Sequence, residues 1–509
     1  MEAIKEDYRT TKAAKQDFAL QNFQYFQLDA GTGNQSSGGT ETGYQLLSYF
    51  GKVNYNYGEK YLASVTLRYD GSSRFGTENQ FGLFPAFNVG WRISSEEFAK
   101  NLTALSNLKI RAGIGRVGNQ KIGNLARFGL YATNYGTMDY SQWFGAWGTI
   151  GSAYDLNGTN SGNLPSGFVA TQQENNSLKW ETTDELNIGL DFGLLNNSIY
   201  GSFDYFTRKS KDILIQPPYA AVIGEGGNRW ENGATISNKG FEAVLGYRQK
   251  KGDFEYSITG TLAHFMDKVD KLPESVIPGY PGNSEQTILG HSQSAIFGYK
   301  WDGIFQNQAE VDAAPASPGK GVGRLRFKDL NGDGKIDSYD QTWLGTTLPK
   351  YEYGVNLEVT YKGILTLSAF INGVAGKKIW DGTKWDQTRV YPSMNFGTHV
   401  FDAWTPKNPG SHLAALTLAD PNNEGRSSDF MYVKGDYARL RNLQLTYALP
   451  GGISQKLRIE RLSIYVMAEN LLTVYHNKGA DKMYAPDPEK PNISYPLTKN
   501  YTLGLTVSF

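Results

Sequence analysis

The sequence predicts an all-β protein, and within that class an antiparallel transmembrane β-barrel. Three observations predict it: segment after segment alternates apolar and polar residues, short turns alternate with long polar loops, and the last alternating segment ends on an aromatic residue, Phe509. Alternation at period two is typical of a strand with one apolar and one polar face. An even series of such strands, with turns at one end and loops at the other, indicates an outer-membrane barrel.

The alternation is clearest in "YLASVTLRYD". Tyr61, Val65 and Leu67 fall on one face of this segment, whereas Arg68 and Asp70 fall on the other. Period 3.6, the mark of an amphipathic helix, hardly occurs. The same count predicts fourteen strands, near residues 15–29, 45–57, 61–71, 81–94, 107–117, 178–195, 198–213, 231–250, 254–267, 351–361, 364–375, 436–449, 461–473 and 500–509.

The connections between these strands alternate in length, which predicts the orientation of the barrel. Outer-membrane barrels carry short turns on the periplasmic side and long loops on the extracellular side. The short connections are 58–60, 196–197, 250–253 and 362–363, joined by the intermediate turns 95–106 and 450–460. The long loops, which we expect to face outward, are 118–177, 268–350, 376–435 and 474–499.

Composition excludes several classes of protein. Lys plus Arg and Asp plus Glu number 50 each, which argues against a nucleic-acid-binding surface. No stretch approaches the roughly 18 apolar residues of a membrane helix. Cysteine is absent, so disulfides and thiolate chemistry are excluded. The first residues, "MEAIKEDYRTTKAAKQDF", are charged throughout and lack the apolar region of a secretory signal, so we expect an incomplete chain.

A soluble all-β protein, such as a propeller or stacked sandwiches, is the alternative fold. The polar strand faces argue against it, because Lys52, Arg68, Asp191, Asp204 and Glu358 are too many charges for a dry core. No repeat of the length of a propeller blade occurs. Aromatic residues also gather at strand ends, where the interfacial girdles of a membrane barrel lie.

Most of the chain resembles the SusC/RagA-like TonB-dependent transporters of the Bacteroidetes outer membrane. The segments that carry the resemblance are "LLSYFGKVNYNYGEKYLASVTLRYDGSSRFG" (46–76), "GLFPAFNVGWRISSEEF" (82–98), "LKIRAGIGRVGNQKIGN" (108–124), "LKWETTDELNIGLDFGLLNN" (178–197), "SNKGFEAVLGY" (237–247), "IFGYKWDGIFQNQAEVD" (296–312), "RFKDLNGDGKID" (326–337), "DYARLRNLQLTYALP" (436–450), "AENLLTVY" (468–475) and "DPE" (487–489).

The resemblance implies a large barrel of about 22 strands, filled by an N-terminal plug. It further implies a SusD-like surface lipoprotein that closes the top over a glycan or peptide, and energy from the TonB complex. With 14 predicted strands, residues 1–509 are expected to be the C-terminal part of that barrel, without plug, TonB-box region or signal peptide. By the same resemblance, Phe509 belongs to the signal read by the barrel-assembly machinery.

The segment "DLNGDGKIDSYD" has the spacing of a calcium-binding loop. Side-chain oxygens would occupy positions 1, 3, 5, 9 and 12, with a backbone carbonyl at position 7 and Gly334 at the turn. The ligands would be Asp329, Asn331, Asp333, Lys335 (through its carbonyl), Asp337 and Asp340. Position 12 is Asp rather than the usual Glu. The alternative is a cluster of Asn-Gly and Asp-Gly turns on a solvated loop; we expect a structural Ca²⁺.

Tryptophans in the predicted outer loops form the second candidate site. The flat apolar face of a sugar ring stacks on an indole, while sugar hydroxyls bind neighbouring amides and carboxylates. The candidate ligand-binding residues are Trp143, Trp147, Trp230, Trp301, Trp380 and Trp385. The alternative is that these rings anchor the packing of the loops or contact a partner lipoprotein.

A glycoside hydrolase is the enzymatic alternative, since acidic and aromatic residues are common to both classes. No compact acid pair, nucleophile elbow or phosphate loop stands out, and the five histidines are scattered, so we expect no enzyme. The function expected is energy-dependent import of oligosaccharides or peptides across the outer membrane. The alternative function is a soluble or surface all-β glycan-binding protein.

Overall fold

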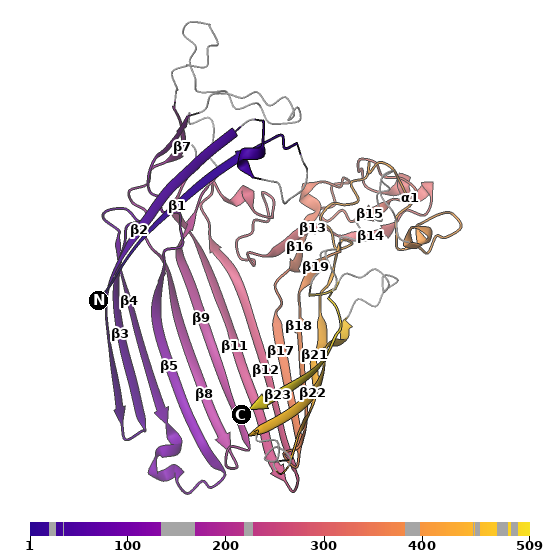
Figure 1. The fold of residues 1–509 in the computed structure, drawn as a ribbon. Coiled ribbons are helices and arrows are strands. Elements are labelled where there is room, and N and C mark those ends of the chain that lie inside the picture. The colour runs from indigo at the N-terminus through magenta and orange to yellow at the C-terminus, as the bar shows by residue number, and fades with distance from the viewer. Residues whose placement is uncertain are drawn as a thin grey trace.

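A computed structural model describes residues 1–19, 27–33, 35–133, 168–217, 228–381, 398–450, 452, 459–475, 487–489 and 497–508. These residues form one antiparallel sheet of 14 strands, curved into an open trough (Figure 1). Its strands are β1 (Glu2–Lys15), β2 (Gln35–Tyr57), β3 (Tyr61–Ser72), β4 (Phe81–Arg92), β5 (Leu105–Asn119), β8 (Glu181–Leu194), β9 (Ile199–Ile215), β11 (Glu231–Lys251), β12 (Phe254–Lys271), β17 (Tyr351–Tyr361), β18 (Leu365–Ala375), β21 (Tyr437–Ala448), β22 (Arg461–Tyr475) and β23 (Asn500–Ser508).

The order of strands in the sheet follows the order in the chain, as in an up-and-down barrel. Twelve of the fourteen predicted strands are confirmed to within a few residues, because each carries its own period-two pattern. The strand predicted at 45–57 is also present, but β2 begins ten residues earlier, at Gln35. Among the described strands, β1 and β23 do not pair with one another, so the sheet has two free edges. Phe509 lies outside the described residues, so its role in assembly stays a prediction.

The prediction of the first strand is wrong. The strand expected at 15–29 is replaced by β1, which begins at Glu2 and ends at Lys15, and the described part of 15–29 contains only a short 3-10 turn, η2 (Leu28–Ala30). Charges lie on both faces of β1, so it shows no apolar alternation. Strand β1 is held by its hydrogen-bonded ladder with β2 rather than by an apolar face. An exposed ion pair of 2.7 Å between Arg9 and Glu41 adds to this ladder.

The predicted alternation of turns and loops is confirmed. The short turns lie together at one end of the trough, and the long connections lie at the other (Figure 1). In the turn between β17 and β18, Lys362 and Gly363 have φ of 51° and 67°. Two consecutive left-handed residues make the type I′ turn, whose twist matches that of paired strands. The turn between β4 and β5 holds two 3-10 turns, η3 (Ile93–Ser95) and η4 (Glu97–Ala99).

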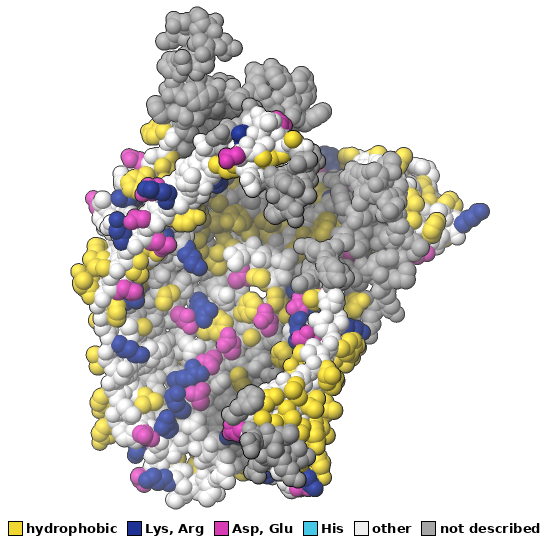
Figure 2. Space-filling model, in the orientation of Figure 1, with side chains coloured by type: hydrophobic (Ala, Val, Ile, Leu, Met, Phe, Trp, Pro, Cys, Tyr) yellow, Lys and Arg dark blue, Asp and Glu magenta, His cyan; other side chains and the backbone are white. Residues whose placement is uncertain are grey.

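The two faces of the sheet differ in chemistry. Large apolar side chains project from the outer face, where Leu67 is 52% and Phe87 44% exposed. Figure 2 looks into the trough and shows Lys, Arg, Asp and Glu side chains gathered on its concave face. An apolar outer face and a charged inner face are what a membrane barrel requires.

The described helices are short, and none has the length and apolar character needed to cross a membrane.

The long loops carry smaller elements of their own. These are β6 (Leu130–Thr133), β7 (Phe168–Gln173), β10 (Asn228–Arg229), η7 (Ile277–Gly279), β13 (Ala295–Tyr299), β14 (Trp301–Ile304), α1 (Gln308–Ala313), β15 (Leu325–Phe327), η8 (Ser338–Asp340), β16 (Gln341–Thr346), β19 (Lys378–Trp380), η9 (Thr398–Asp402) and β20 (Tyr432–Lys434). The clusters of buried apolar side chains lie at this loop end, since the sheet itself exposes its apolar face.

Candidate functional site

The inner wall of the trough carries a network of paired charges. Both terminal nitrogens of Arg111 on β5 donate to the carboxylate of Asp204 on β9, at 2.6 Å each. Arg111 also contacts Asp191 on β8, which Lys109 reaches at 3.2 Å. Charged side chains facing lipid would cost a few kcal/mol each. Their pairing on the concave face therefore indicates a polar lumen.

A second network fastens the segment 487–489 to strand β21. Arg439, whose side chain is 1% exposed, donates to Asp487 and Glu489 at 2.6 Å each and to the hydroxyl of Thr473 at 2.9 Å. Arg441 donates to both oxygens of Glu489, at 2.8 and 2.9 Å. Bidentate pairs of this kind fix geometry as well as charge. The "DPE" segment is thus held against the wall.

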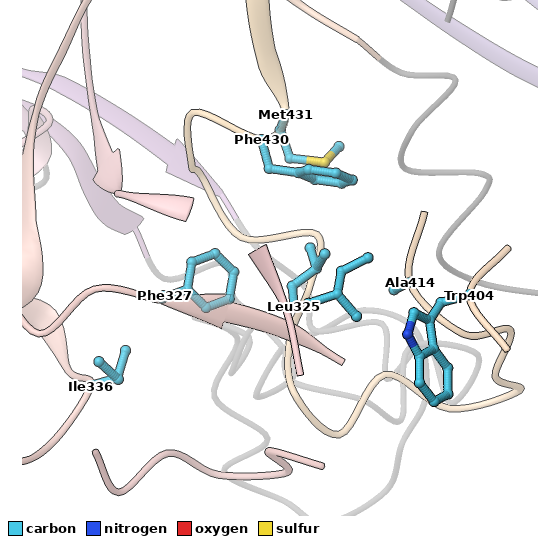
Figure 3. Close-up of a cluster of buried hydrophobic side chains, with 8 residues drawn as sticks. Leu325, Phe327, Ile336, Trp404, Ala414, Phe430 and Met431 are labelled. Atoms are coloured by element: carbon cyan, nitrogen blue, oxygen red, sulfur yellow. The ribbon is translucent and has the colours of Figure 1, made fainter. Parts of the chain in front are cut away.

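Two long connections fold together into a compact unit, which we call the two-loop subdomain. It consists of the described residues within 272–350, between β12 and β17, and within 376–436, between β18 and β21. Its strands pair as β13 with β16, β14 with β15, and β19 with β20. Figure 3 shows its apolar core, to which both connections contribute; the labelled residues are Leu325, Phe327, Ile336, Trp404, Ala414, Phe430 and Met431.

A buried ion pair joins the two connections of the subdomain. Arg324 donates to Glu424 at 3.2 Å, and Glu424 has no exposed surface. The second oxygen of Glu424 accepts from the backbone N–H of Leu325 at 2.8 Å, and Asn422 donates to the carbonyl of Leu325 at 2.9 Å. Burial raises the pKa of Glu424, and the charge of Arg324 opposes that shift. Removing one partner would leave a buried charge, so this pair holds the two loops together.

Two predicted tryptophans lie in this subdomain and pack against its core. The indole N–H of Trp301 donates to the carbonyl of Gly303 at 2.8 Å, and its ring lies 5.3 Å from that of Phe430. The ring of Trp380 meets that of Tyr432 edge-on at 5.1 Å. Both rings are partly buried, as the packing alternative predicts. Each keeps some exposed surface.

The other predicted tryptophans are not brought to the same place. Trp230 packs against a separate cluster that includes Phe75, Leu178 and Trp180, near the loop end of β4 and β8. Trp143, Trp147 and Trp385 lie outside the described residues. The structure therefore does not assemble the six rings into one surface, and sugar stacking stays a prediction.

The predicted calcium loop is shaped by its own backbone amides. Asp329 accepts from the N–H groups of Gly332 at 2.6 Å and Gly334 at 2.8 Å, and both glycines have positive φ. Asp340 is fully buried and accepts from the N–H groups of Leu330 and Asp337, each at 2.8 Å. Three further side chains accept from an amide two residues on, namely Asn331, Asp333 and Asp337.

These bonds satisfy the carboxylates without an ion, as the turn alternative predicts. Across the residues that the structure describes, no three Asp, Glu or His side chains converge as a metal site. Calcium binding stays a prediction. The amide of Lys335 donates to Asp333, and its side chain is exposed.

Comparison with known proteins assigns the barrel. Residues 3–374 match the family model described as TonB dependent receptor-like, beta-barrel. The chain belongs to this family. It lies in the outer membrane, and the soluble alternative is wrong.

The relatives agree with this assignment. The chain is 29% identical to TonB-dependent receptor P3 of Formosa agariphila, over 98% of the chain and 49% of the relative. It is 27% identical to TonB-dependent receptor SusC of Bacteroides thetaiotaomicron, over 91% of the chain and 44% of the relative. The RagAB peptide transporter shares the fold, with a TM-score of 0.78 at 21% identity, over 99% of this chain and 52% of that one. The chain spans about half the length of the relatives it matches.

Sequence reasoning missed both buried arginine networks. The segments "DYARLRNLQLTYALP" and "DPE" carry part of the family resemblance, but the sequence predicts no contact between them. Arg439 gives only a weak signal that it needs a partner, because β21 also carries Arg441, Asn442 and Gln444 and Arg439 does not stand out among them. Nothing in the sequence indicates which acid that partner is. The pair Arg324 and Glu424 gives no periodic signal at all, since both residues lie in irregular loops.

Proposed function

We propose that this chain forms the C-terminal wall and outer loops of a TonB-dependent importer for oligosaccharides or peptides. The observation that carries the proposal is a single sheet with an apolar outer face, a charged inner face and a compact two-loop subdomain at one end. The names of relatives support it, since one is SusC and another is the RagAB peptide transporter. In this proposal, residues 1–509 belong to a larger barrel whose plug, TonB-box region and signal peptide lie elsewhere in the protein.

The charged lumen would serve the transport step. Paired charges such as Arg111 with Asp204 give the inner wall hydrogen-bonding groups at fixed positions. A hydrated wall of this kind lets a polar solute pass without losing its own hydrogen bonds to hydrocarbon. Energy would enter when the TonB complex acts on the plug.

The two-loop subdomain would be the seat of a SusD-like lipoprotein that closes the lumen from outside. Its own core and the buried pair of Arg324 and Glu424 make it a preformed surface rather than a mobile loop. A preformed surface loses less entropy on binding than a flexible one. We propose no catalytic role for the chain.

The test uses the full-length transporter in cells that produce its lipoprotein. Uptake of fluorescent oligosaccharides and of fluorescent peptides should each be measured with and without TonB. We expect one solute class to enter, and only when TonB is present. Uptake that persists at the same rate without TonB would contradict the proposal.

A matched pair of variants tests the role of the subdomain. Glu424→Ala should reduce co-purification of the lipoprotein, because it leaves Arg324 buried without a counter-charge. Lys250→Gln, at the exposed end of β11 beside the turn at the opposite end of the wall, should leave co-purification unchanged. Equal co-purification with both variants would show that the lipoprotein sits elsewhere.

A further inference from the structure

The wall of the barrel splits between strands β4 and β5. The ladder that joins them runs from the pair Arg92 and Lys109 to the pair Ala86 and Gly115, and stops there. Both strands continue beyond this point, β4 paired only with β3 and β5 paired only with β8. The first residue past the split is Pro85, which has no N–H to donate and suits the end of a ladder.

Aromatic side chains pack together beside the split. Phe84 and Trp180 are 6% and 7% exposed, and their rings meet edge-on at 5.2 Å. The indole N–H of Trp180 donates to the carbonyl of Gln80 at 2.8 Å, which fixes the ring. A side chain at Gly118 would collide with both rings, so glycine is required there. Side-chain packing thus takes the place of the ladder beyond the split.

The outer side of the split remains open as a cavity of about 580 Å³. Its apolar lining comes from Val65, Pro85, Phe87, Ile114 and Leu186. Phe87 pairs with Ile114, and Ile114 pairs with Leu186, so these three side chains share the lipid-facing side of the sheet. The volume is in the range of small-molecule sites. In a membrane, an apolar cavity on this face is in contact with hydrocarbon rather than water.

A cationic rim lies directly above the apolar lining. Arg116, Asp184 and Lys209 are partners in adjacent strands and all line the cavity. Arg116 and Lys211 both bind Asp184, at 2.6 and 2.7 Å, so two cations share one acid. The exposed side chain of Lys209 makes no ion pair within the described part of the chain. Glu185 also lines the cavity and is paired with Arg208 at 2.9 Å. With these two included, four cations stand against two acids, so the rim remains positive.

The rim also marks the edge of the apolar band. The outer face of β5 changes from Ile114 to Arg116, and that of β8 changes from Leu186 to Asp184. This change occurs toward the loop end of the wall, where the headgroups of the outer leaflet lie. Anionic headgroups are attracted by basic side chains at that depth.

We propose that this cavity is a binding site for an anionic lipid of the outer leaflet. One acyl chain would fill the gap between β4 and β5, and a phosphate-bearing headgroup would contact Lys209 and the free donors of Arg116. The acyl chain would pack against β4 and β5 where their hydrogen-bonded ladder has ended, and this packing would stabilise the wall there.

The test uses the full-length transporter in detergent and native mass spectrometry with two probes, palmitoyl-oleoyl phosphatidylglycerol and its phosphatidylcholine analogue. Wild type should retain phosphatidylglycerol more strongly. Lys209→Gln should weaken the binding of phosphatidylglycerol about fivefold, which is the effect expected of one cation near an anionic headgroup. It should leave the binding of phosphatidylcholine unchanged. Val65→Phe, which fills the cavity, should weaken both. Lys239→Gln is the matched control, since Lys239 is exposed on neighbouring β11 and does not line the cavity.

Three results would overturn the proposal. Phosphatidylglycerol retained equally by wild type, Lys209→Gln and Val65→Phe would remove the site. If Lys239→Gln weakens the binding of phosphatidylglycerol as much as Lys209→Gln does, the lipid is held by general attraction to basic residues and not by this site. If inorganic phosphate displaces phosphatidylglycerol, and Val65→Phe still binds phosphatidylglycerol normally, the site binds an anion and not a lipid. If Val65→Phe does not assemble, Leu186→Phe fills the same cavity from β8.

Discussion

Glu96 shows how one carboxylate can organise the turn end of the wall. It accepts from the hydroxyl of Tyr61 at 2.7 Å, the ammonium of Lys60 at 2.9 Å and the indole N–H of Trp91 at 3.1 Å. These donors, led by Tyr61, lower the pKa of Glu96 from 4.5 to about 2. Tyr61 and Trp91 thereby hold their rings at the edge of the apolar face, where an interfacial girdle lies.

The first prediction follows from this depressed pKa. Because the folded value lies below the unfolded one, the contribution of Glu96 is present above about pH 4.5 and is lost as the pH falls toward 2. The thermal unfolding temperature of wild type should therefore fall relative to that of Glu96→Gln across that window. Plotted against pH, the unfolding temperatures of the two proteins should converge near pH 2. We expect a small effect, since Glu96 lies in a turn at the surface, where solvent and salt screen the ion pair. Parallel curves from pH 7 to 2 would show that the three donors contribute nothing.

At the scale of a strand, β3 tests which face meets lipid. Leu67 lies mid-strand on the outer face and is 52% exposed, whereas Arg68 lies on the inner face and donates to Asp70 at 2.6 Å. Leu67→Arg should cost on the order of 2–4 kcal/mol if it lies at mid-bilayer. Urea-dependent folding into lipid vesicles measures this cost.

Arg68→Leu is the control for that measurement. It should be milder, because an inner-face apolar residue meets a hydrated lumen rather than hydrocarbon, and the remaining cost should come from Asp70, which is 7% exposed and loses its partner. The same cost for both substitutions would argue that neither face contacts lipid.

The loop 329–340 is the element on which the calcium prediction rests. If a cation binds, titration calorimetry on the full-length transporter should detect an affinity of roughly 10⁻⁴ to 10⁻³ M. Chelation, or Asp329→Ala with Asp333→Ala, should then raise protease sensitivity near 320–345 and leave the barrel folded. The amides that already satisfy Asp329 and Asp340 offer the competing account. A calorimetric trace without calcium uptake would leave the loop as a set of turns.

At the scale of the whole molecule, the grouping of turns and loops predicts the orientation in the membrane. The short turns, among them 250–253, should face the periplasm, and the two-loop subdomain should face outward (Figure 1). An epitope tag inserted near residue 400 of the intact transporter should be labelled on living cells. A tag at 251 should be labelled only after the membrane is opened, and labelling of the 251 tag on intact cells would invert the orientation.

The sequence by itself determined most of the wall. Strand β3 could be placed from its alternation of Tyr61, Val65 and Leu67 with Arg68 and Asp70, and the turn at Lys362 and Gly363 from its place between two such runs. Both signals are local, because side chains alternate along every strand and turn chemistry spans a few residues. The division between an apolar outer and a charged inner face follows from the same alternation.

The tertiary structure alone decided which residues meet across the chain. Strand β1 was missed because its partner β2, not an apolar face, holds it in place. Arg324 finds Glu424 a hundred residues away, and the split above Ala86 and Gly115 depends on how far two ladders run. A single charge or a strand end produces no periodic pattern in the sequence. Its partner depends on which distant segments come together when the loops close, so local sequence patterns do not predict it.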